Sequence, residues 1–196
     1  NPAASVSAEP DTRTFAALPQ TGEITIPLRE QEGYLFARVT INGVPAGWFM
    51  VDTGSTLNIV SPGVAGRLQL PKLDGEHDVV GVGGRDRFSF RGVERVTVAG
   101  HALEVEKLAA INMHSLGRSI GLPTAGIIGF GAFGGAPFTL DFVEQTLTVH
   151  EAATFKPPQG AAGPFRWQSS LPLVRARLGD RREVVLLLDS GAGQSL

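Results

Sequence analysis

The chain has 196 residues, of which 42% are hydrophobic and 18% charged, with a formal net charge of −2. This much apolar surface excludes a long disordered chain, and the length allows one domain, or one domain and part of another. The sequence contains no cysteine, no basic stripe and no apolar run near the roughly 18 residues that a membrane helix needs. We therefore expect no disulfide, no nucleic-acid partner and no membrane span.

Residues 1–21 lack periodicity and are predicted to form an irregular tail. From 22 to 150, short apolar segments separated by glycine are typical of an all-β domain. Within it, Tyr34–Ile41 alternates like a half-buried strand, and Asn42-Gly43 predicts a tight turn. Trp48–Val51 is apolar throughout, which favours a strand buried on both faces.

One helix and a second hairpin are predicted in the same region. Ser61–Leu68 has the pattern of a short helix, with Ser61 as the N-cap and proline at the first helical position. Val93–Val98 and Leu103–Leu108 flank Ala99-Gly100-His101, which predicts a hairpin. No other helix is predicted.

The last part of the chain divides in two. Residues 151–169 are rich in Pro, Gly and Ala and are predicted to be a linker. A new strand pattern starts at Leu171, so 170–196 is predicted to be the first part of a separate unit.

An internal repeat links the two parts of the chain. Ala37–Ile41 corresponds to Val174–Leu178, and Met50–Gly54 corresponds to Leu187–Gly191, with an offset of 137 residues in both comparisons (174 − 37 and 187 − 50). A single Asp-Thr/Ser-Gly tripeptide is often an ordinary turn. Two in register, each after an apolar strand, indicate a duplicated structural unit.

Five segments follow one another in a recognisable order: Val51–Ser55, Gly81–Gly84, Ile127–Gly129, Phe138–Phe142 and Thr146–Val149. Over about residues 24–150 this order resembles one lobe of the aspartic protease superfamily, and most closely bacterial two-lobed relatives of pepsin and retropepsin. The resemblance implies an all-β fold: a retropepsin/pepsin-like β-barrel lobe in 22–150, and the start of a second homologous lobe in 170–196.

The resemblance also implies a chemistry. Asp52 and Asp189 would share one proton and activate a water molecule that hydrolyses a peptide bond, as an aspartic endopeptidase does. The residues expected to support this pair are Thr53, Gly54, Ser55, Ser190 and Gly191. A substrate-binding flap is expected at Val80, Gly81, Val82, Gly83 and Gly84, although these residues also fit a mobile loop without substrate contact. The ψ-shaped loop is expected at Ile127, Ile128 and Gly129.

The two acidic motifs differ at one position. Ser55 is expected to hydrogen-bond the outer oxygen of Asp52, whereas its counterpart, Ala192, has no side-chain donor. This difference predicts that Asp52 is the ionised member of the pair.

Other chemistries find less support. Gly129–Gly134 matches the dinucleotide-binding pattern G-x-G-x-x-G, but Gly135 and Pro137 interrupt any following helix. The four histidines lack metal-binding spacing, and neither Ser55 nor Ser190 lies in G-x-S-x-G. We expect no metal and no cofactor.

Several alternatives stay open. The active site could be homodimeric, with Asp52 from each protomer, or the chain could be a non-catalytic peptide-binding module. The expected partners are a peptide or protein substrate and the remainder of the second lobe, supplied by the same gene after cleavage, by residues outside this sequence, or by another protomer. The start at Asn1 fits a removed signal peptide or an arbitrary boundary, so a periplasmic or secreted location is favoured over a cytoplasmic one.

Overall fold

The computed structural model describes residues 22–81, 84–133, 136–157, 159–160, 163–168, 171–179 and 182–193. For residues 79–81 and 84–86 the description covers the backbone. β-Strands are the main secondary structure of the described residues, as the sequence predicted, and they form three sheets.

The main sheet contains ten strands. They are β2 (Arg29–Gln31), β3 (Tyr34–Ile41), β4 (Val44–Asp52), β5 (Ile59–Val60), β6 (His77–Gly81), β7 (Gly84–Gly92), β8 (Val96–Val98), β9 (His101–Leu103), β10 (Lys107–Ala110) and β11 (Thr124–Gly129). Their order is β6-β7-β10-β5-β11-β4-β3-β8-β9, and β2 pairs with β3.

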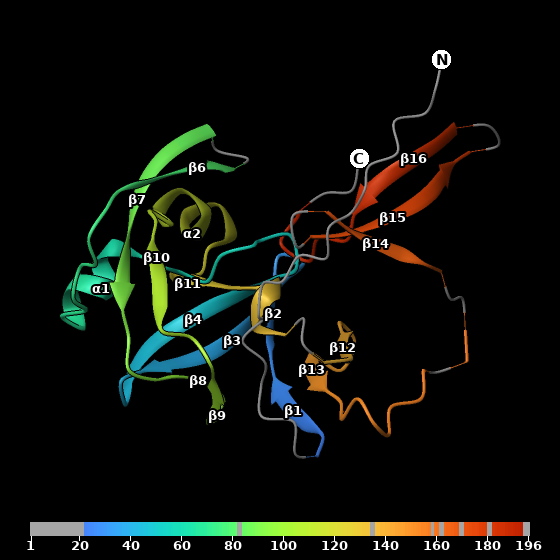
Figure 1. The fold of residues 1–196 in the computed structure, drawn as a ribbon, viewed down its shortest axis with the longest axis horizontal. Coiled ribbons are helices and arrows are strands. Elements are labelled where there is room, and N and C mark those ends of the chain that lie inside the picture. Colours follow the sequence, from blue (N-terminus) through green and yellow to red (C-terminus); the bar gives the residue numbers. More distant parts are fainter. Residues whose placement is uncertain are drawn as a thin grey trace.

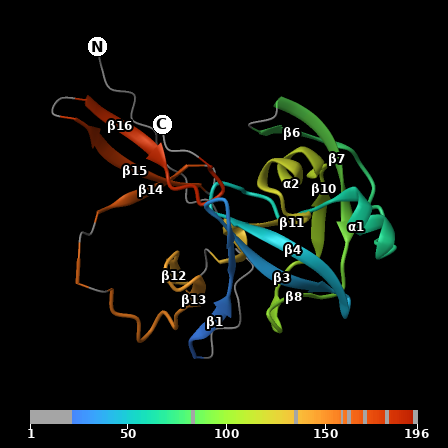
Figure 2. The ribbon, with the colours of Figure 1, turned by 180° about the vertical axis from the view of Figure 1, so that it is seen from behind.

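Two smaller sheets and three short helices complete the described structure. One sheet has the order β1-β13-β12, from β1 (Ile24–Pro27), β12 (Phe138–Asp141) and β13 (Thr146–Val149). The other has the order β14-β15-β16, from β14 (Phe165–Gln168), β15 (Leu171–Leu178) and β16 (Arg182–Leu187). The helices are α1 (Pro62–Arg67), α2 (His114–Ile120) and the 3₁₀ helix η1 (Phe130–Ala132). The β6–β7 hairpin and the β14–β16 sheet lie on opposite sides of the molecule (Figures 1 and 2).

Both hairpins predicted from sequence are confirmed. Ile41 faces Val44 across a two-residue turn in which Asn42 and Gly43 have φ of 50° and 79°. Both central residues of this tight turn need positive φ, and Asn and Gly tolerate it best. The second hairpin is shorter than predicted, because Val98 already pairs with His101.

The β4 strand crosses the centre of the core. Its residues Phe49 and Val51 are fully buried, which confirms the predicted buried strand. The strand pairs in parallel with β11, and Gly129 lies beside Asp52 at the end of both strands. The end of β11 thereby lies next to the first acidic motif.

Gly126 of β11 gives a test of how tightly this core is packed. A β-carbon at Gly126 would collide with the Ile59 carbonyl oxygen and the Phe49 ring. We expect Gly126→Ala to lower the free energy of unfolding by about 1–3 kcal/mol, since overpacking forces the backbone to move. Urea denaturation measures the change. The control is Gly63→Ala in α1, where a β-carbon meets nothing within 4 Å; equal stability of the two variants would contradict the packing.

One helix was predicted and one was missed. Helix α1 begins as predicted, because the Ser61 hydroxyl accepts a hydrogen bond from Val64 N at 3.3 Å. Helix α2 has no side-chain N-cap and contains Gly117, so its sequence carries no start signal. It ends at Gly121, which has the left-handed φ of 70° that is typical after a helix.

The β1-β13-β12 sheet covers one side of the core. Ile26 faces Leu147 across β1 and β13, and both are fully buried. The opposite face of this sheet carries polar residues, because successive side chains of a strand alternate between faces.

The β14-β15-β16 sheet is far less buried than the corresponding strands of the first copy. Trp167, Val185 and Leu188 are each between 46% and 48% exposed. Strand β14 lies inside the range 151–169 that was predicted to be a linker. Although that range is rich in Pro, Gly and Ala, it contains Phe165 and Trp167, and aromatic residues favour strands.

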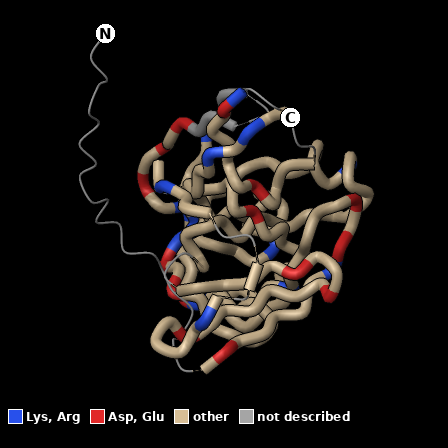
Figure 3. The backbone as a smooth tube through the Cα atoms, turned by 90° about the vertical axis from the view of Figure 1, so that its right-hand side faces the viewer, with Lys and Arg blue, Asp and Glu red and all other residues tan. Residues whose placement is uncertain are grey.

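Charges of both signs are distributed over the described backbone (Figure 3). Among the described helices, none is long and apolar enough to span a membrane.

Candidate active site

The two acidic motifs meet near the middle of the molecule, where β4 and β16 end (Figure 1). The Thr53 hydroxyl donates to Leu188 O at 2.7 Å and accepts from Ser190 N at 2.9 Å. Reciprocally, the Ser190 hydroxyl donates to Val51 O at 2.9 Å and accepts from Thr53 N at 3.0 Å. These four bonds satisfy the buried Thr53 and fix one loop against the other.

The glycines of the motifs let the carboxylates approach. A β-carbon at Gly54 would collide with the carboxyl group of Asp189, and one at Gly191 would collide with that of Asp52. Each carboxylate also accepts a hydrogen bond from the glycine of its own motif, at 2.8 Å in both loops. The arrangement is therefore nearly symmetric, and both halves come from the same chain.

This proximity changes the acidity of one carboxyl group. Burial, the charge of Asp189 and a hydrogen bond to Asp189 together raise the pKa of Asp52 from 3.8 to about 7. Hydrogen bonds from the backbone of Gly54 and Ser55 oppose the rise without cancelling it. The Asp52–Asp189 pair therefore holds one proton below neutral pH. That Asp52 is the ionised member of the pair stays a prediction.

The Ser55 side chain does not make the contact that was expected of it. Its hydroxyl donates to Leu57 O at 2.9 Å and accepts from Leu57 N at 3.2 Å, rather than reaching the outer oxygen of Asp52. Ser55 therefore supports the shape of the loop, and its hydroxyl does not distinguish Asp52 from Asp189.

The residues expected to form the ψ-shaped loop lie next to the loop of the first acidic motif. Ile128 is fully buried, and Gly129 N donates to Asn58 Oδ1 at 3.0 Å. Phe130 N donates to Ser55 O at 2.9 Å. The sequence analysis missed Asn58, since a single Asn in a loop carries no signal until its partner is known.

The expected flap residues lie in the β6–β7 hairpin. Val80 pairs with Arg85, and Gly81 pairs with Gly84 at its end. Val82 and Gly83 lie outside the described residues. The described part of the expected flap is thus a hairpin that is paired up to Gly81 and Gly84.

Tyr34 provides another link between the two copies. Its hydroxyl lies against Gly193, where a β-carbon would collide with it. Tyr34 begins β3 in the first copy, and Gly193 follows the second acidic motif. Sequence reasoning missed this contact because the repeat aligns Tyr34 with Leu171, which has no hydroxyl.

An aromatic contact joins the copies on another side. The ring centroids of Trp167 and Phe130 are 4.9 Å apart, with an interplanar angle of 61°. Trp167 pairs with Pro172, whose carbonyl oxygen accepts from Leu188 N at 2.9 Å. Leu188 O accepts a hydrogen bond from the Thr53 hydroxyl. The aromatic contact is therefore linked, through Pro172 and Leu188, to the hydrogen bonds around the acidic pair.

We expect Trp167→Ala to lower kcat for peptide hydrolysis up to about tenfold, since such an aromatic pair contributes about 0.5–1.5 kcal/mol to holding the copies together. Trp167→Phe should restore most of the rate. The control is Val185→Ala, which removes an exposed apolar side chain from the same sheet. An unchanged kcat in Trp167→Ala would show that the contact does not position the acidic pair.

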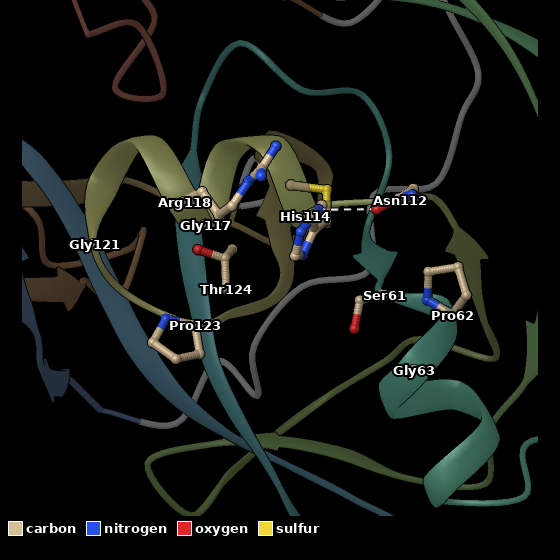
Figure 4. Close-up of a pocket in the computed structure, with 11 residues that line it drawn as sticks. Ser61, Pro62, Gly63, Asn112, His114, Gly117, Arg118, Gly121, Pro123 and Thr124 are labelled. Atoms are coloured by element: carbon tan, nitrogen blue, oxygen red, sulfur yellow. Dashed lines mark hydrogen bonds between the residues drawn. The ribbon is translucent and has the colours of Figure 1, made fainter.

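The close-up in Figure 4 shows a pocket of about 620 Å³ between the start of α1 and helix α2. Its lining includes Ser61, Asn112, His114, Arg118 and Thr124. None of the residues expected at the active site lines it. Within the described residues, no group of three or more His, Asp or Glu is arranged to hold a metal ion.

Comparison with known proteins agrees with this geometry. Residues 37–131 match the family model described as aspartyl protease. A retropepsin-like aspartic protease from Rickettsia conorii is similar in structure, with 18% identity and a TM-score of 0.44 over 65% of this chain and 89% of that one. No curated protein gives a significant sequence match. The family match over residues 37–131 supports an assignment of this all-β lobe to the aspartic protease superfamily.

Proposed function

We propose that the chain is an aspartic-type endopeptidase that hydrolyses peptide bonds with a water molecule activated between Asp52 and Asp189. One observation carries the proposal: each carboxyl group packs against the glycine of the other motif, within a single chain. Peptide binding alone would not require two carboxyl groups to be held together at the cost of a raised pKa.

The proposed step uses the proton on Asp52. Asp189 acts as the base that takes a proton from water, while water oxygen adds to the scissile carbonyl carbon. Asp52 donates its proton to the carbonyl oxygen, giving a neutral tetrahedral diol. Collapse of the diol breaks the C–N bond: Asp189 gives its proton to the leaving nitrogen, and Asp52 takes a proton from one hydroxyl of the diol as the new carboxyl group forms. Both carboxyl groups thereby return to their starting states, and no covalent enzyme intermediate forms.

We propose that the substrate is an extended peptide held under the flap at residues 80–84. The β6–β7 hairpin lies in antiparallel register, so its end can offer backbone hydrogen bonds to a peptide. Residues 22–150 would form the first lobe, 151–169 would connect the lobes apart from β14, and 170–196 would supply the second acidic motif.

In the homodimeric alternative, Asp52 of a second protomer would face Asp52. The Asp189 carboxyl group of the same chain lies against Gly54, next to Asp52. This placement supports the intramolecular pair over the homodimeric one.

The test is incubation of the purified chain with a mixture of peptides between pH 3 and 7 in ¹⁸O-labelled water, followed by mass spectrometry. We expect cleavage with one solvent oxygen in the new carboxyl group in a single turnover, and no trapped acyl-enzyme. Peptides that bind without being cleaved at any of these pH values would favour the binding-module alternative. A covalent adduct on the chain during turnover would contradict the proposed step.

A further inference from the structure

The solvent-facing side of the β1-β13-β12 sheet carries a row of hydroxyl groups. Thr139 of β12 lies opposite Thr148 of β13, which in turn lies opposite Thr25 of β1. Glu23 lies two residues before Thr25, and His150 lies two residues after Thr148. The period of two places all five side chains on the same face.

Three of these side chains form a linear relay. His150 Nε2 is 2.8 Å from the Thr139 hydroxyl, and His150 Nδ1 is 2.8 Å from Glu23 Oε1. The His150 side chain is 14% exposed, and the ring of Phe155 packs at 4.7 Å from it. Its backbone N donates to Pro137 O at 2.8 Å. The imidazole is therefore held in place on several sides, while the Thr139 side chain is open to solvent.

The hydrogen-bond inventory fixes the direction of the relay. An ionised carboxylate has acceptors only, so His150 must donate from Nδ1 to Glu23. In neutral imidazole, Nε2 then carries the lone pair and accepts from the Thr139 hydroxyl. A hydroxyl that donates to an oriented imidazole, which in turn donates to a carboxylate, is the arrangement that activates a nucleophilic oxygen.

We propose that Thr139 is an activated nucleophile that accepts an acyl group from activated esters, at a site separate from Asp52 and Asp189. The Thr139 oxygen attacks the ester carbonyl carbon while its proton moves to His150 Nε2. The bond to the leaving alcohol breaks, and this alcohol takes the proton from His150. The products are O-acyl-threonine and free alcohol, and no oxidant or further reactant is needed.

Thr148 provides the matched comparison within the same sheet. It lies directly opposite Thr139, and its hydroxyl is 3.3 Å from the Thr25 hydroxyl rather than beside an imidazole. The two threonines share a face and a strand pair, but Thr139 is exposed and Thr148 is half-buried. The change in Thr139 labelling between the wild type and His150→Gln therefore tests the relay, and Thr148 shows the background reactivity of a hydroxyl on this sheet.

The experiment treats the full chain with p-nitrophenyl acetate near pH 7.5 and locates the added 42 Da, the mass that acetylation brings, by peptide mass spectrometry. We expect Thr139 to be labelled first, and His150→Gln to slow its labelling by about 10²-fold, as loss of a general base does. Glu23→Gln should slow it less, since the imidazole loses its orientation but stays in place. Thr148→Val and Asp189→Asn should leave the rate unchanged, which separates this site from the proposed protease site.

Several outcomes would overturn the proposal. These are equal labelling of Thr139 and Thr148, stable label on His150 in place of Thr139, or unchanged labelling in His150→Gln. Because His150 also contributes to packing, the melting temperature of each variant is measured by circular dichroism. If His150→Gln is unfolded, the folded variant Glu23→Gln decides, and labelling of Thr139 at the wild-type rate in that variant contradicts the relay.

Discussion

Replacing either Asp52 or Asp189 with Asn should lower kcat/KM for peptide hydrolysis by about 10³-fold or more. Each replacement removes one of the two proton-transfer groups of the proposed step, and one such group contributes about 10²–10⁴-fold. Asn keeps the size of the side chain, so the hydrogen bonds between the loops should persist. Initial rates with a fluorogenic peptide, at substrate concentrations below KM, measure the effect.

The two variants also separate the intramolecular pair from the homodimer. If the pair is intramolecular, both single variants are inactive and mixing them restores nothing. If Asp52 of two protomers formed the site, Asp189→Asn would keep full activity. Asp74→Asn is the control, since it changes an exposed Asp in the segment before β6. A fully active Asp189→Asn variant would therefore refute the proposed pair.

The repeat made this site predictable to an unusual degree. The offset of 137 residues found in the sequence separates the two side chains that brace the loops, Thr53 and Ser190. Local pattern also sufficed for the β3–β4 hairpin, because alternation and the Asn42-Gly43 turn are properties of adjacent residues.

Other features depend on residues that only the fold brings together. Helix α2 has no side-chain cap, and it packs through Gly117 against Leu122 and Thr124. The contact of Tyr34 with Gly193 joins positions that the repeat does not relate. The relay of Glu23, Thr139 and His150 spans 127 residues of sequence across three strands. No periodicity or motif encodes such contacts, so the sequence analysis noted of His150 only that it lacks metal-binding spacing.

The expected hydrogen bond from Ser55 to Asp52 shows the same limit more sharply. The sequence shows that Ser55 has a hydroxyl where Ala192 has none. Whether this hydroxyl affects Asp52 depends on the direction in which it points, which the sequence does not show. Turned toward Leu57, it leaves burial and Asp189 to govern the pKa of Asp52.

That pKa leads to a second prediction, on stability and activity together. The pKa of Asp52 is raised from 3.8 to about 7 in the folded chain. Between pH 4 and 7 the folded state therefore binds a proton that the unfolded state releases, and stability falls as pH rises. The contribution is complete below about pH 4, is lost as pH rises through 7, and amounts to about 4 kcal/mol.

Asp52→Asn removes this titration, so the variant should be more stable than the wild type at pH 8 and lose that advantage at pH 4. Urea denaturation at pH 4, 6 and 8 measures both proteins. Wild-type activity should fall about tenfold for each pH unit above 7, because the proposed step needs the proton on Asp52. Parallel stability curves for the two proteins would contradict the raised pKa. A variant that gains stability at pH 8 while losing catalysis would show that the fold is less stable because it buries two carboxyl groups together.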